Sequence, residues 1–253
     1  MSGQLTLSQL EHKAITIRED IIRMLEHAGS GHSAGPLGLA DVFTALYFNI
    51  LKHDPKNPEW SERDILFLSN GHCVPVRYAT MAEAGYFPVD ELMTLRKFGS
   101  RLQGHPERLR LPGMETTSGP LGSGLSQAAG AAYVLKNIDR DPHRWIYTVM
   151  GDGELDEGNI WEAAMFAGKY KLHNLIGIID RNNIQIDGNT EDVMPLEDLK
   201  GKWEAFGWHV QEIDGNNIES IIDASSSSAN VRARFANPRS VTTTRSSISL
   251  CLK

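Results

Sequence analysis

Two short apolar segments, each ending in a cluster of Gly, Asp and Asn, constrain the fold of this 253-residue chain more than any other feature. Trp145 to Met150 leads into Gly151-Asp152-Gly153-Glu154, and Leu175 to Asp180 leads into Arg181-Asn182-Asn183. The residues between them, from about Gly158 to Tyr170, show a helical pattern. This order predicts a right-handed βαβ unit, in which both strands point the same way.

The same alternation recurs outside this unit. An apolar run, Ile65 to Leu68, leads into a Gly-His turn and a helical stretch from Val74 to Ala84. A further strand is predicted from Trp208 to Ile213, followed by a helix from Ile218 to Ala224. Strands that alternate with helices predict an α/β fold, in which a parallel sheet is covered by helices on both faces.

The N-terminal part reads as helix, loop and helix. Apolar residues recur with a helical period from Leu7 to Ala28, where Ser8 and Glu11 are spaced as a capping box and Gly29 is placed to end the helix. A Gly-rich loop follows, and a second helical stretch leads to Ile50.

We expect one main domain over residues 1–224. From Ser225 onward the chain becomes rich in Ser, Thr and Arg and has few residues that could fill a core. Residues 225–253 are therefore predicted to be an atypical, poorly structured tail.

Composition excludes several classes of function. The chain carries 25 Lys and Arg against 32 Asp and Glu, a net charge of −7, so extended nucleic-acid or anionic membrane surfaces are poor partners. No apolar run approaches the roughly 18 residues needed to cross a bilayer, and no signal pattern precedes the first helix, so we expect a soluble, cytoplasmic protein. The two cysteines, Cys73 and Cys251, are too isolated to indicate a disulfide framework or a zinc site.

The two Gly-Asp-Asn clusters predict a metal and diphosphate site. Successive parallel strands bring Asp152 and Asn182 to the same edge of the sheet, where open α/β sheets bind ligands. One carboxylate, one amide oxygen and a backbone carbonyl near Ile184 suit a hard cation and leave positions for phosphate oxygens and water. Gly151 and Gly153 let the backbone approach the phosphates. Either cluster alone could be an ordinary turn, but their combination after two strands favours the site.

Three histidines directly follow glycine in predicted loops: His32, His72 and His105. Such loops suit neutral imidazoles that bind substrate hydroxyl groups or shuttle protons. A single one could be an ordinary solvated histidine, and it is the recurrence that favours a function.

A loop rich in Gly and Ser, Thr116 to Ser126, opens an Ala-rich helix from Gln127 to Leu135. Small residues there would let a cofactor lie against the backbone. The loop matches neither the Walker motif nor the dinucleotide-binding fingerprint, so by itself it is weak evidence.

With these motifs together, the chain resembles the N-terminal, diphosphate-binding domain of transketolases, and in particular the separate N-terminal subunit of split transketolases. The likeness spans about residues 7–224 in order. The matching motifs are GSGHSAGPLG, LSNGH, GSRLQGHPE, TTSGPLGSGLS, MGDGELDEGNIWEA, DRNNIQIDG and WEAFGWHVQEIDG.

The resemblance implies an enzyme that moves a two-carbon ketol unit between phosphorylated sugars with thiamine diphosphate, which carries the difficult chemistry. It implies that Asp152, Asn182 and the Ile184 carbonyl hold Mg²⁺, or Ca²⁺ or Mn²⁺. Glu157 would lie at the subunit interface. The implied catalytic residues are His32, His72 and His105, and the implied cofactor-binding residues are His72, Gly119, Pro120, Leu121, Gly153, Glu154, Asn182 and Ile184.

The resemblance also implies a partner. The family activates the cofactor's aminopyrimidine with a glutamate from a pyrimidine-binding domain, which this chain lacks, so a C-terminal transketolase subunit is expected to supply it in a dimer or heterotetramer. The family carries a further histidine element, but no histidine follows His209 here. We interpret Asn237 to Lys253 as a frameshifted or truncated reading of the gene, which predicts a loss of stability.

Two alternatives remain at this point. Another thiamine-diphosphate enzyme, such as deoxyxylulose-phosphate synthase, would share the metal and diphosphate site. A truncated, non-catalytic relic would fit the atypical tail.

Overall fold

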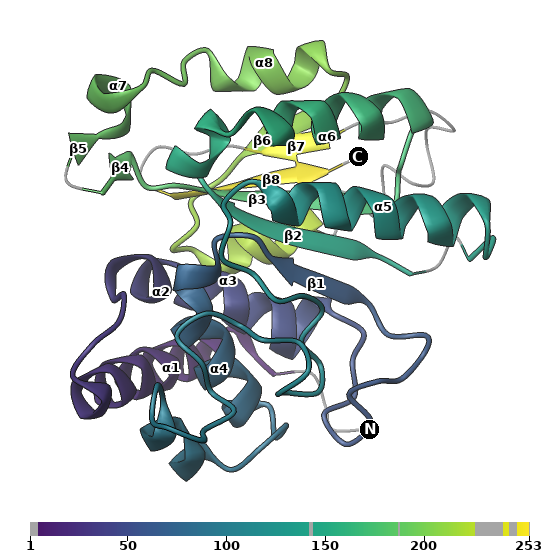
Figure 1. Ribbon diagram of the computed structural model, residues 1–253. Coiled ribbons are helices and arrows are strands. Elements are labelled where there is room, and N and C mark those ends of the chain that lie inside the picture. Colours follow the sequence, from purple (N-terminus) through teal and green to yellow (C-terminus); the bar gives the residue numbers. More distant parts are fainter. Residues whose placement is uncertain (1–4, 142–143, 187, 226–239, 243–246, 253) are drawn as a thin grey trace.

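The computed structural model describes residues 5–141, 144–186, 188–225, 240–242 and 247–252. A sheet lies between two layers of helices, with α5, α6 and α8 on one face and α1, α3 and α4 on the other (Figure 1). The predicted fold class, an α/β fold with a parallel sheet flanked by helices on both faces, is confirmed. No helix in the described part of the chain combines the length and apolar character needed to span a membrane.

The helices are α1 (Leu7–Ala28), α2 (Ala34–Gly38), α3 (Ala40–Ala45), α4 (Val74–Glu83), α5 (Ser123–Asn137), α6 (Gly158–Tyr170), α7 (Thr190–Val193) and α8 (Leu199–Ala205), with a further helix over residues 218–225. Short 3₁₀ turns lie at Gly71–Cys73, Val89–Thr94 and Gly153–Asp156, and a π-helical turn lies at Leu46–Ile50. The strands are β1 (Ile65–Leu68), β2 (Ile146–Gly151), β3 (Leu175–Arg181), β4 (Ile184–Gln185), β5 (Gly188–Asn189), β6 (His209–Glu212), β7 (Ser240–Thr242) and β8 (Ser247–Leu252).

The parallel part of the sheet consists of β1, β2 and β3, with β2 in the middle. The strand β8 then pairs antiparallel with β3 and with β6, and β6 pairs in parallel with β7, so the sheet is not parallel throughout. The order is β1-β2-β3-β8-β6-β7. The predicted βαβ unit is therefore present as β2, α6 and β3.

Two of these strands, β7 and β8, come from the segment 225–253, for which we expected little structure. The residues Ser247 to Leu252 read SISLCL, an alternation of period two that the Ser-rich composition of the tail conceals. Residues 226–239, 243–246 and 253 lie outside the described residues, so the expectation for the tail as a whole stays a prediction.

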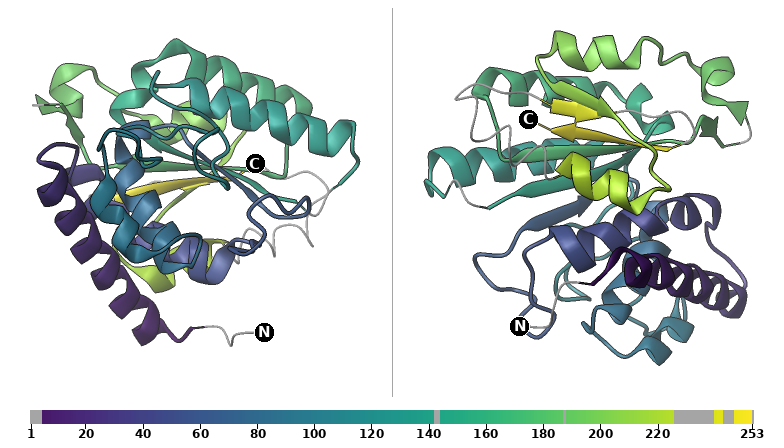
Figure 2. Two further views of the ribbon diagram at one scale, coloured as in Figure 1. Left: turned by 60° about the horizontal axis from the view of Figure 1, so that its bottom comes forward. Right: turned by 180° about the vertical axis from the view of Figure 1, so that it is seen from behind.

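Side chains of the central strands alternate between two apolar cores, as the pleat of a strand requires. The core on the α1 and α4 side also receives the helix over residues 218–225, which lies on that face in Figure 2. The strand residues in this core are Leu66, Leu68, Tyr147, Val149, Ile176 and Ile178. Those in the opposite core, beneath α5, α6 and α8, are Phe67, Ile146, Met150, Leu175, Ile179 and Val210.

The first helix spans the predicted residues but is capped differently. Thr6 Oγ1 accepts a hydrogen bond from the Gln9 backbone N–H, and the Thr6 N–H donates to Gln9 Oε1, so the capping box is Thr6 and Gln9 rather than Ser8 and Glu11. Both pairs have the required spacing, and the sequence pattern does not decide between two starts one half-turn apart. Gly29 ends the helix with a φ of 67°, as predicted.

Candidate functional site

Four loops meet at the carboxyl edge of the parallel strands. They follow β1 (residues 69–73), precede α5 (residues 118–122), follow β2 (residues 151–157) and follow β3 (residues 182–186). This is the edge at which open α/β sheets bind ligands. Every residue that the sequence analysis assigned to the metal or to the cofactor lies in one of these loops.

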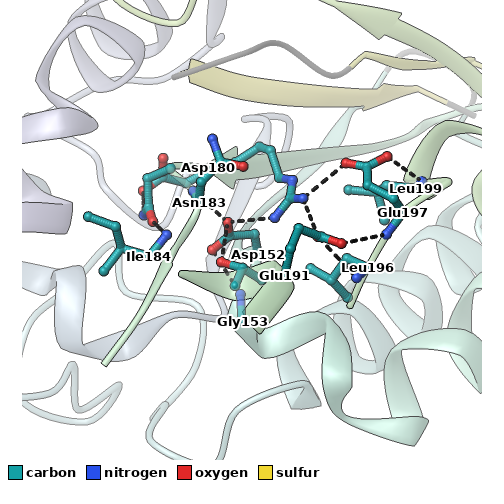
Figure 3. A network of polar contacts seen from close by, with 12 residues as sticks. Asp152, Gly153, Asp180, Asn183, Ile184, Glu191, Leu196, Glu197 and Leu199 are labelled. Carbon is teal, nitrogen blue, oxygen red and sulfur yellow. Dashed lines mark hydrogen bonds and ion pairs between the residues drawn. The ribbon is translucent and has the colours of Figure 1, made fainter. Parts of the chain in front are cut away.

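Asp152 is the buried acid at the centre of this edge, with a relative exposure of 1%. Its Oδ2 accepts hydrogen bonds from Arg181 Nη1 (3.1 Å), the Asn183 backbone N–H (2.8 Å) and Thr190 Oγ1 (3.1 Å). Its Oδ1 accepts one, from the Gly153 N–H (2.8 Å). The two oxygens of this carboxylate therefore have different surroundings (Figure 3).

The turn after β3 brings amide and carbonyl oxygens next to that carboxylate. Asn182 Oδ1 accepts from the Ile184 N–H (2.9 Å), and Asn182 Nδ2 donates to Asp180 Oδ2 (3.0 Å). The backbone of Asn183, between Asn182 and Ile184, is bonded to Asp152. Burial raises the pKa of Asp180 to about 7, with a smaller contribution from the charge of Asp152.

These oxygens are a donor set that a divalent hard cation could use. A carboxylate oxygen with one protein partner, an amide oxygen and a main-chain carbonyl match the chemistry that Mg²⁺ and Ca²⁺ prefer. Gln185 Oε1, buried beside Gly153, has no hydrogen-bond partner in the described structure. No group of three or more His, Cys, Asp or Glu side chains in the described residues could hold a metal, so a site here would combine the one carboxylate of Asp152 with neutral oxygens. The residues present fit a metal with a bound anion.

Glu154 joins three of the four loops. Its Oε1 accepts from Ser69 Oγ and from the Gly122 N–H (2.6 Å), and its Oε2 accepts from the Gly151 N–H (3.1 Å). Its side chain is buried, and that burial raises its pKa. Both of its oxygens are engaged by the protein, so Glu154 holds these loops together, and its contact with a cofactor stays a prediction.

The three predicted histidines are brought together from loops far apart in the sequence. The ring centroids of His32 and His72 are 5.1 Å apart, and those of His32 and His105 are 6.4 Å apart. A Cβ atom added to Gly71 would overlap Ser118 Oγ and lie 3.2 Å from the His105 ring. The loops of Ser118 and His105 can therefore approach position 71 this closely only because it is glycine. His32, His72 and His105 thus form one cluster beside the loop that precedes α5.

The environment keeps two of these imidazoles neutral. Burial lowers the pKa of His72 to about 4, and the neighbouring His32 and His105 add to the effect. The pKa of His105 is lowered by burial and then by the charges of His32 and Arg96. Neutral imidazoles can both donate and accept a hydrogen bond, which suits contact with hydroxyl groups.

The lowered pKa of His72 predicts that its ring takes up a proton only near pH 4. Because an unfolded histidine titrates near pH 6.5, the unfolded chain binds more protons between these values. The contribution of His72 to stability is therefore complete above about pH 6.5 and declines as the pH falls toward 4. An NMR titration of the His72 ring protons, assigned with a His72→Gln variant, should give a midpoint near 4. A midpoint at the ordinary histidine value would contradict the described burial.

A cavity of about 640 Å³ opens beside His105. Arg96, which has a φ of 60°, lies in its wall, where its Nη1 donates to Ser30 Oγ (3.2 Å). Its guanidinium packs against the backbone of Gly104, because a Cβ atom added to Gly104 would lie 2.5 Å from Arg96 Nε. No carboxylate among the described residues forms an ion pair with Arg96, although Glu107 also lines the cavity. The cavity thus has a guanidinium in its wall, next to the histidine cluster, that no carboxylate of the described residues pairs with.

The loop before α5 is open to solvent at its centre. Gly119, Pro120 and Leu121 are exposed, and a Cβ on Gly119 would meet nothing within 4 Å. Ser118, at the start of this loop, is buried and lines the cavity, yet its Oγ has no partner in the described structure. The loop leaves space in which a ligand could contact main chain.

Sequence reasoning missed several residues of this site. Arg181 and Thr190 bind Asp152, Ser69 binds Glu154, and Arg96 lines the cavity. Arg181 had a usable signal, because a cation at the end of a largely apolar, buried strand needs acids around it. Thr190, Ser69 and Arg96 depend on contacts between loops, which no local sequence pattern predicts.

Comparison with protein families gives a match to the model described as "Transketolase, thiamine diphosphate binding domain" over residues 10–245. The 6-deoxy-6-sulfo-D-fructose transketolase subunit SqwG of Clostridium sp. (strain MSTE9) is 48% identical over 215 residues, which cover 85% of this chain and 78% of that protein. An apulose-4-phosphate transketolase subunit of Phocaeicola vulgatus is 43% identical over 213 residues, covering 84% of this chain and 75% of that protein.

Among solved structures, the transketolase from Leishmania mexicana superposes with a TM-score of 0.86 at 33% identity. The match covers 94% of this chain but 37% of that one. This chain therefore spans a little over a third of that transketolase and most of the length of the two subunit proteins.

Proposed function

The chain belongs to the transketolase family, as its thiamine-diphosphate-binding domain, and from this we propose that it is the N-terminal subunit of a split transketolase. In this role it transfers a two-carbon ketol unit between sugars together with a partner subunit. The observation that carries the proposal is the meeting of Asp152 with the Asn182 to Ile184 turn at the carboxyl edge of β2 and β3. The names of the two subunit relatives support the same conclusion.

We assign the metal to Asp152, the Asn182 side chain and the Ile184 carbonyl, with Mg²⁺ as the preferred ion and Ca²⁺ or Mn²⁺ as substitutes. The diphosphate would complete the coordination, next to Gly153 and the loop of Gly119, Pro120 and Leu121. When bound, thiamine diphosphate supplies the nucleophilic carbon and the electron sink for breaking a carbon–carbon bond beside a carbonyl.

We assign the binding of the sugar in this chain to the histidine cluster. His32, His72 and His105 form one cluster, of which His105 also lines the cavity, and the pKa values of His72 and His105 are lowered. We assign them to hydrogen bonds with sugar hydroxyls and to proton transfer, with His72 closest to the cofactor loops. Glu154 supports the cofactor by fixing the loops.

The cavity wall favours a substrate with an anionic group. The names of two relatives specify a sulfo group and a phosphate on their sugars. Arg96, which forms no ion pair within the described residues, is placed to bind such a group while His105 binds a hydroxyl.

Arg96→Ala is expected to raise KM for an anionic sugar about tenfold or more and to leave kcat nearly unchanged, because a charge-assisted contact made in both ground and transition states is lost. Steady-state kinetics of the assembled enzyme would measure both constants. Lys97→Ala is the matched control, since Lys97 is the adjacent cation and binds the His27 carbonyl outside the cavity. An equal effect of the two substitutions, or an equal loss with an uncharged acceptor such as glycolaldehyde, would contradict the assignment.

The partner is expected to be a C-terminal subunit with a pyrimidine-binding domain, in a dimer or heterotetramer in the cytoplasm. To test the function, the full chain is mixed with that subunit, Mg²⁺ and thiamine diphosphate. Xylulose 5-phosphate with ribose 5-phosphate should give ketol transfer in the mixture and with neither protein alone. Turnover of pyruvate with glyceraldehyde 3-phosphate would instead indicate a deoxyxylulose-phosphate synthase, and no turnover with any tested sugar would favour a non-catalytic relic.

A further inference from the structure

Asp20 is an acid on the buried face of α1. Its relative exposure is 4%, and its neighbours on that face, Ile17, Ile21 and Met24, are fully buried in the apolar core. Its Oδ2 has no hydrogen-bond partner in the described structure, and no cation among the described residues forms an ion pair with it. An ionised carboxylate is unfavourable in such a place, because it has lost its water and gained no cation.

The group that faces Asp20 is a second acid, Glu83, the last residue of α4, which lies against α1 (Figure 2). Lys13 Nζ donates to Glu83 Oε2 (2.5 Å), and the Glu83 side chain is 14% exposed. One bonded cation therefore serves two carboxyl groups, and the C-terminal end of a helix further disfavours a negative charge on Glu83. A proton held between the two carboxyls would remove their repulsion and give Asp20 Oδ2 a partner.

The other charged groups near this pair do not replace that proton. Arg23 and Glu19, on α1, pair with each other at 3.4 Å, and both side chains are more than half exposed. The remaining charged side chains on elements that pack against α1 are Asp41 of α3, Arg77 of α4, and Asp90 and Glu91 of the 3₁₀ turn at Val89–Thr94. Asp41 and Glu91 are paired with arginines, Arg77 donates to two backbone carbonyls, and Asp90 is exposed.

We infer that Asp20 and Glu83 share a single proton in the folded chain, and that this proton makes the packing of α1 on α4 sensitive to pH. The proton comes from solvent and is released to solvent as the pH rises. In support, burial raises the pKa of Asp20 to about 6, and the charge of Glu83 adds to this effect, whereas the charge of Arg23 opposes it.

The direction of the pH effect follows from where the proton is held. An unfolded aspartate releases its proton near pH 3.8, whereas folded Asp20 keeps it to about pH 6, so the folded chain binds more protons between these values. The contribution of the pair to stability is therefore complete below about pH 3.8 and is lost as the pH rises through 6.

The two helices joined by this pair both lead to the histidine cluster. The helix α1 ends at Ala28, directly before the loop that carries His32, and α4 begins two residues after His72. Loosening of α1 from α4 would therefore reach two of the three histidine loops. The inference itself concerns the folded chain alone, and its test requires neither cofactor nor partner, so its failure would leave the proposed function untouched.

The direct test is a ¹³C NMR titration of the Asp20 carboxyl in the full chain, with the resonance assigned by Asp20→Asn. We expect a midpoint near 6 in the wild type. Glu83→Gln should lower this midpoint by about one pH unit or more, because the like charge is replaced by an amide that can donate to Asp20. A wild-type midpoint near that of an ordinary aspartate would overturn the inference. An unchanged midpoint in Glu83→Gln would overturn the shared proton, because burial alone would then account for the shift.

Urea unfolding between pH 4 and 8 gives a second measurement. The ratio of the unfolding constant of Asp20→Asn to that of the wild type should fall roughly 10- to 100-fold over this range, because only the wild type loses the shared proton. Glu19→Gln, at the exposed neighbouring acid, is the control, and its ratio should stay constant. A ratio for Asp20→Asn that does not change with pH would contradict the inference. If Asp20→Asn does not fold, the Glu83→Gln titration decides the question, with the Asp20 resonance assigned through its sequential neighbours.

Discussion

Replacing Asp152 with Ala is expected to abolish metal-dependent binding of thiamine diphosphate. Asp152 is the only carboxylate in the proposed set of ligands, so its loss leaves a hard cation with neutral protein oxygens alone. It also removes the innermost partner of the buried Arg181 guanidinium, although Glu191 and Glu197 remain. Calorimetric titration of thiamine diphosphate in the presence and absence of Mg²⁺ would measure the effect.

Asp156→Ala is the matched control for this substitution, because Asp156 lies exposed in the same turn after β2. It should bind the cofactor like the wild type. An Asp152→Ala protein that folds and still binds thiamine diphosphate only when Mg²⁺ is present would show that the metal is held elsewhere.

Replacing Glu154 with Ala is expected to lower the free energy of unfolding by about 3 kcal/mol, because buried donors from Ser69, Gly122 and Gly151 would lose their acceptor. For a chain of this size that corresponds to a fall in Tm of roughly 6 to 12 °C. Denaturant and thermal unfolding followed by circular dichroism would measure it.

Glu154→Gln should lie between the wild type and Glu154→Ala, because the amide oxygen can still accept from Ser69 and Gly122 while the NH₂ group faces the Gly151 N–H. Glu162→Ala, on the exposed face of α6, is the control and should change stability by less than about 0.5 kcal/mol. Equal Tm values for Glu154→Ala and the wild type would mean that the Glu154 carboxylate does not join the loops as described.

Local patterns in the sequence were enough to predict the framework. The apolar runs and the helical period identified β2, α6 and β3, and the direction of crossover connections then placed Asp152 and Asn182 at one edge. The three Gly-His pairs predicted loop histidines, and the structure brings their rings together. The roles of these residues remain proposals, whereas the placing of Asp152 and Asn182 at one edge follows from strand direction.

The remaining features depend on contacts that no short window contains. The hydrogen bonds of Glu154 with Ser69 and Gly122 could not be read from its motif, because both residues are distant in sequence and meet it only in the folded sheet. Arg181 was placed beside the site by its motif, but its link to Asp152 depends on the register between β2 and β3. The strand β8 alternates Ser and Cys with Ile and Leu, and it joins β3 through a pairing that period and composition cannot specify.

The central claim is that the carboxyl edge of β2 and β3 holds a divalent cation that in turn binds the diphosphate. A crystal structure of the chain with its partner subunit, grown with Mn²⁺ and thiamine diphosphate, would test it through the anomalous scattering of manganese. We expect one anomalous peak in contact with Asp152 Oδ1, Asn182 Oδ1 and the Ile184 carbonyl, with diphosphate oxygens completing the coordination. A diphosphate bound at this edge with no peak beside Asp152, or a peak and diphosphate elsewhere in the chain, would contradict it.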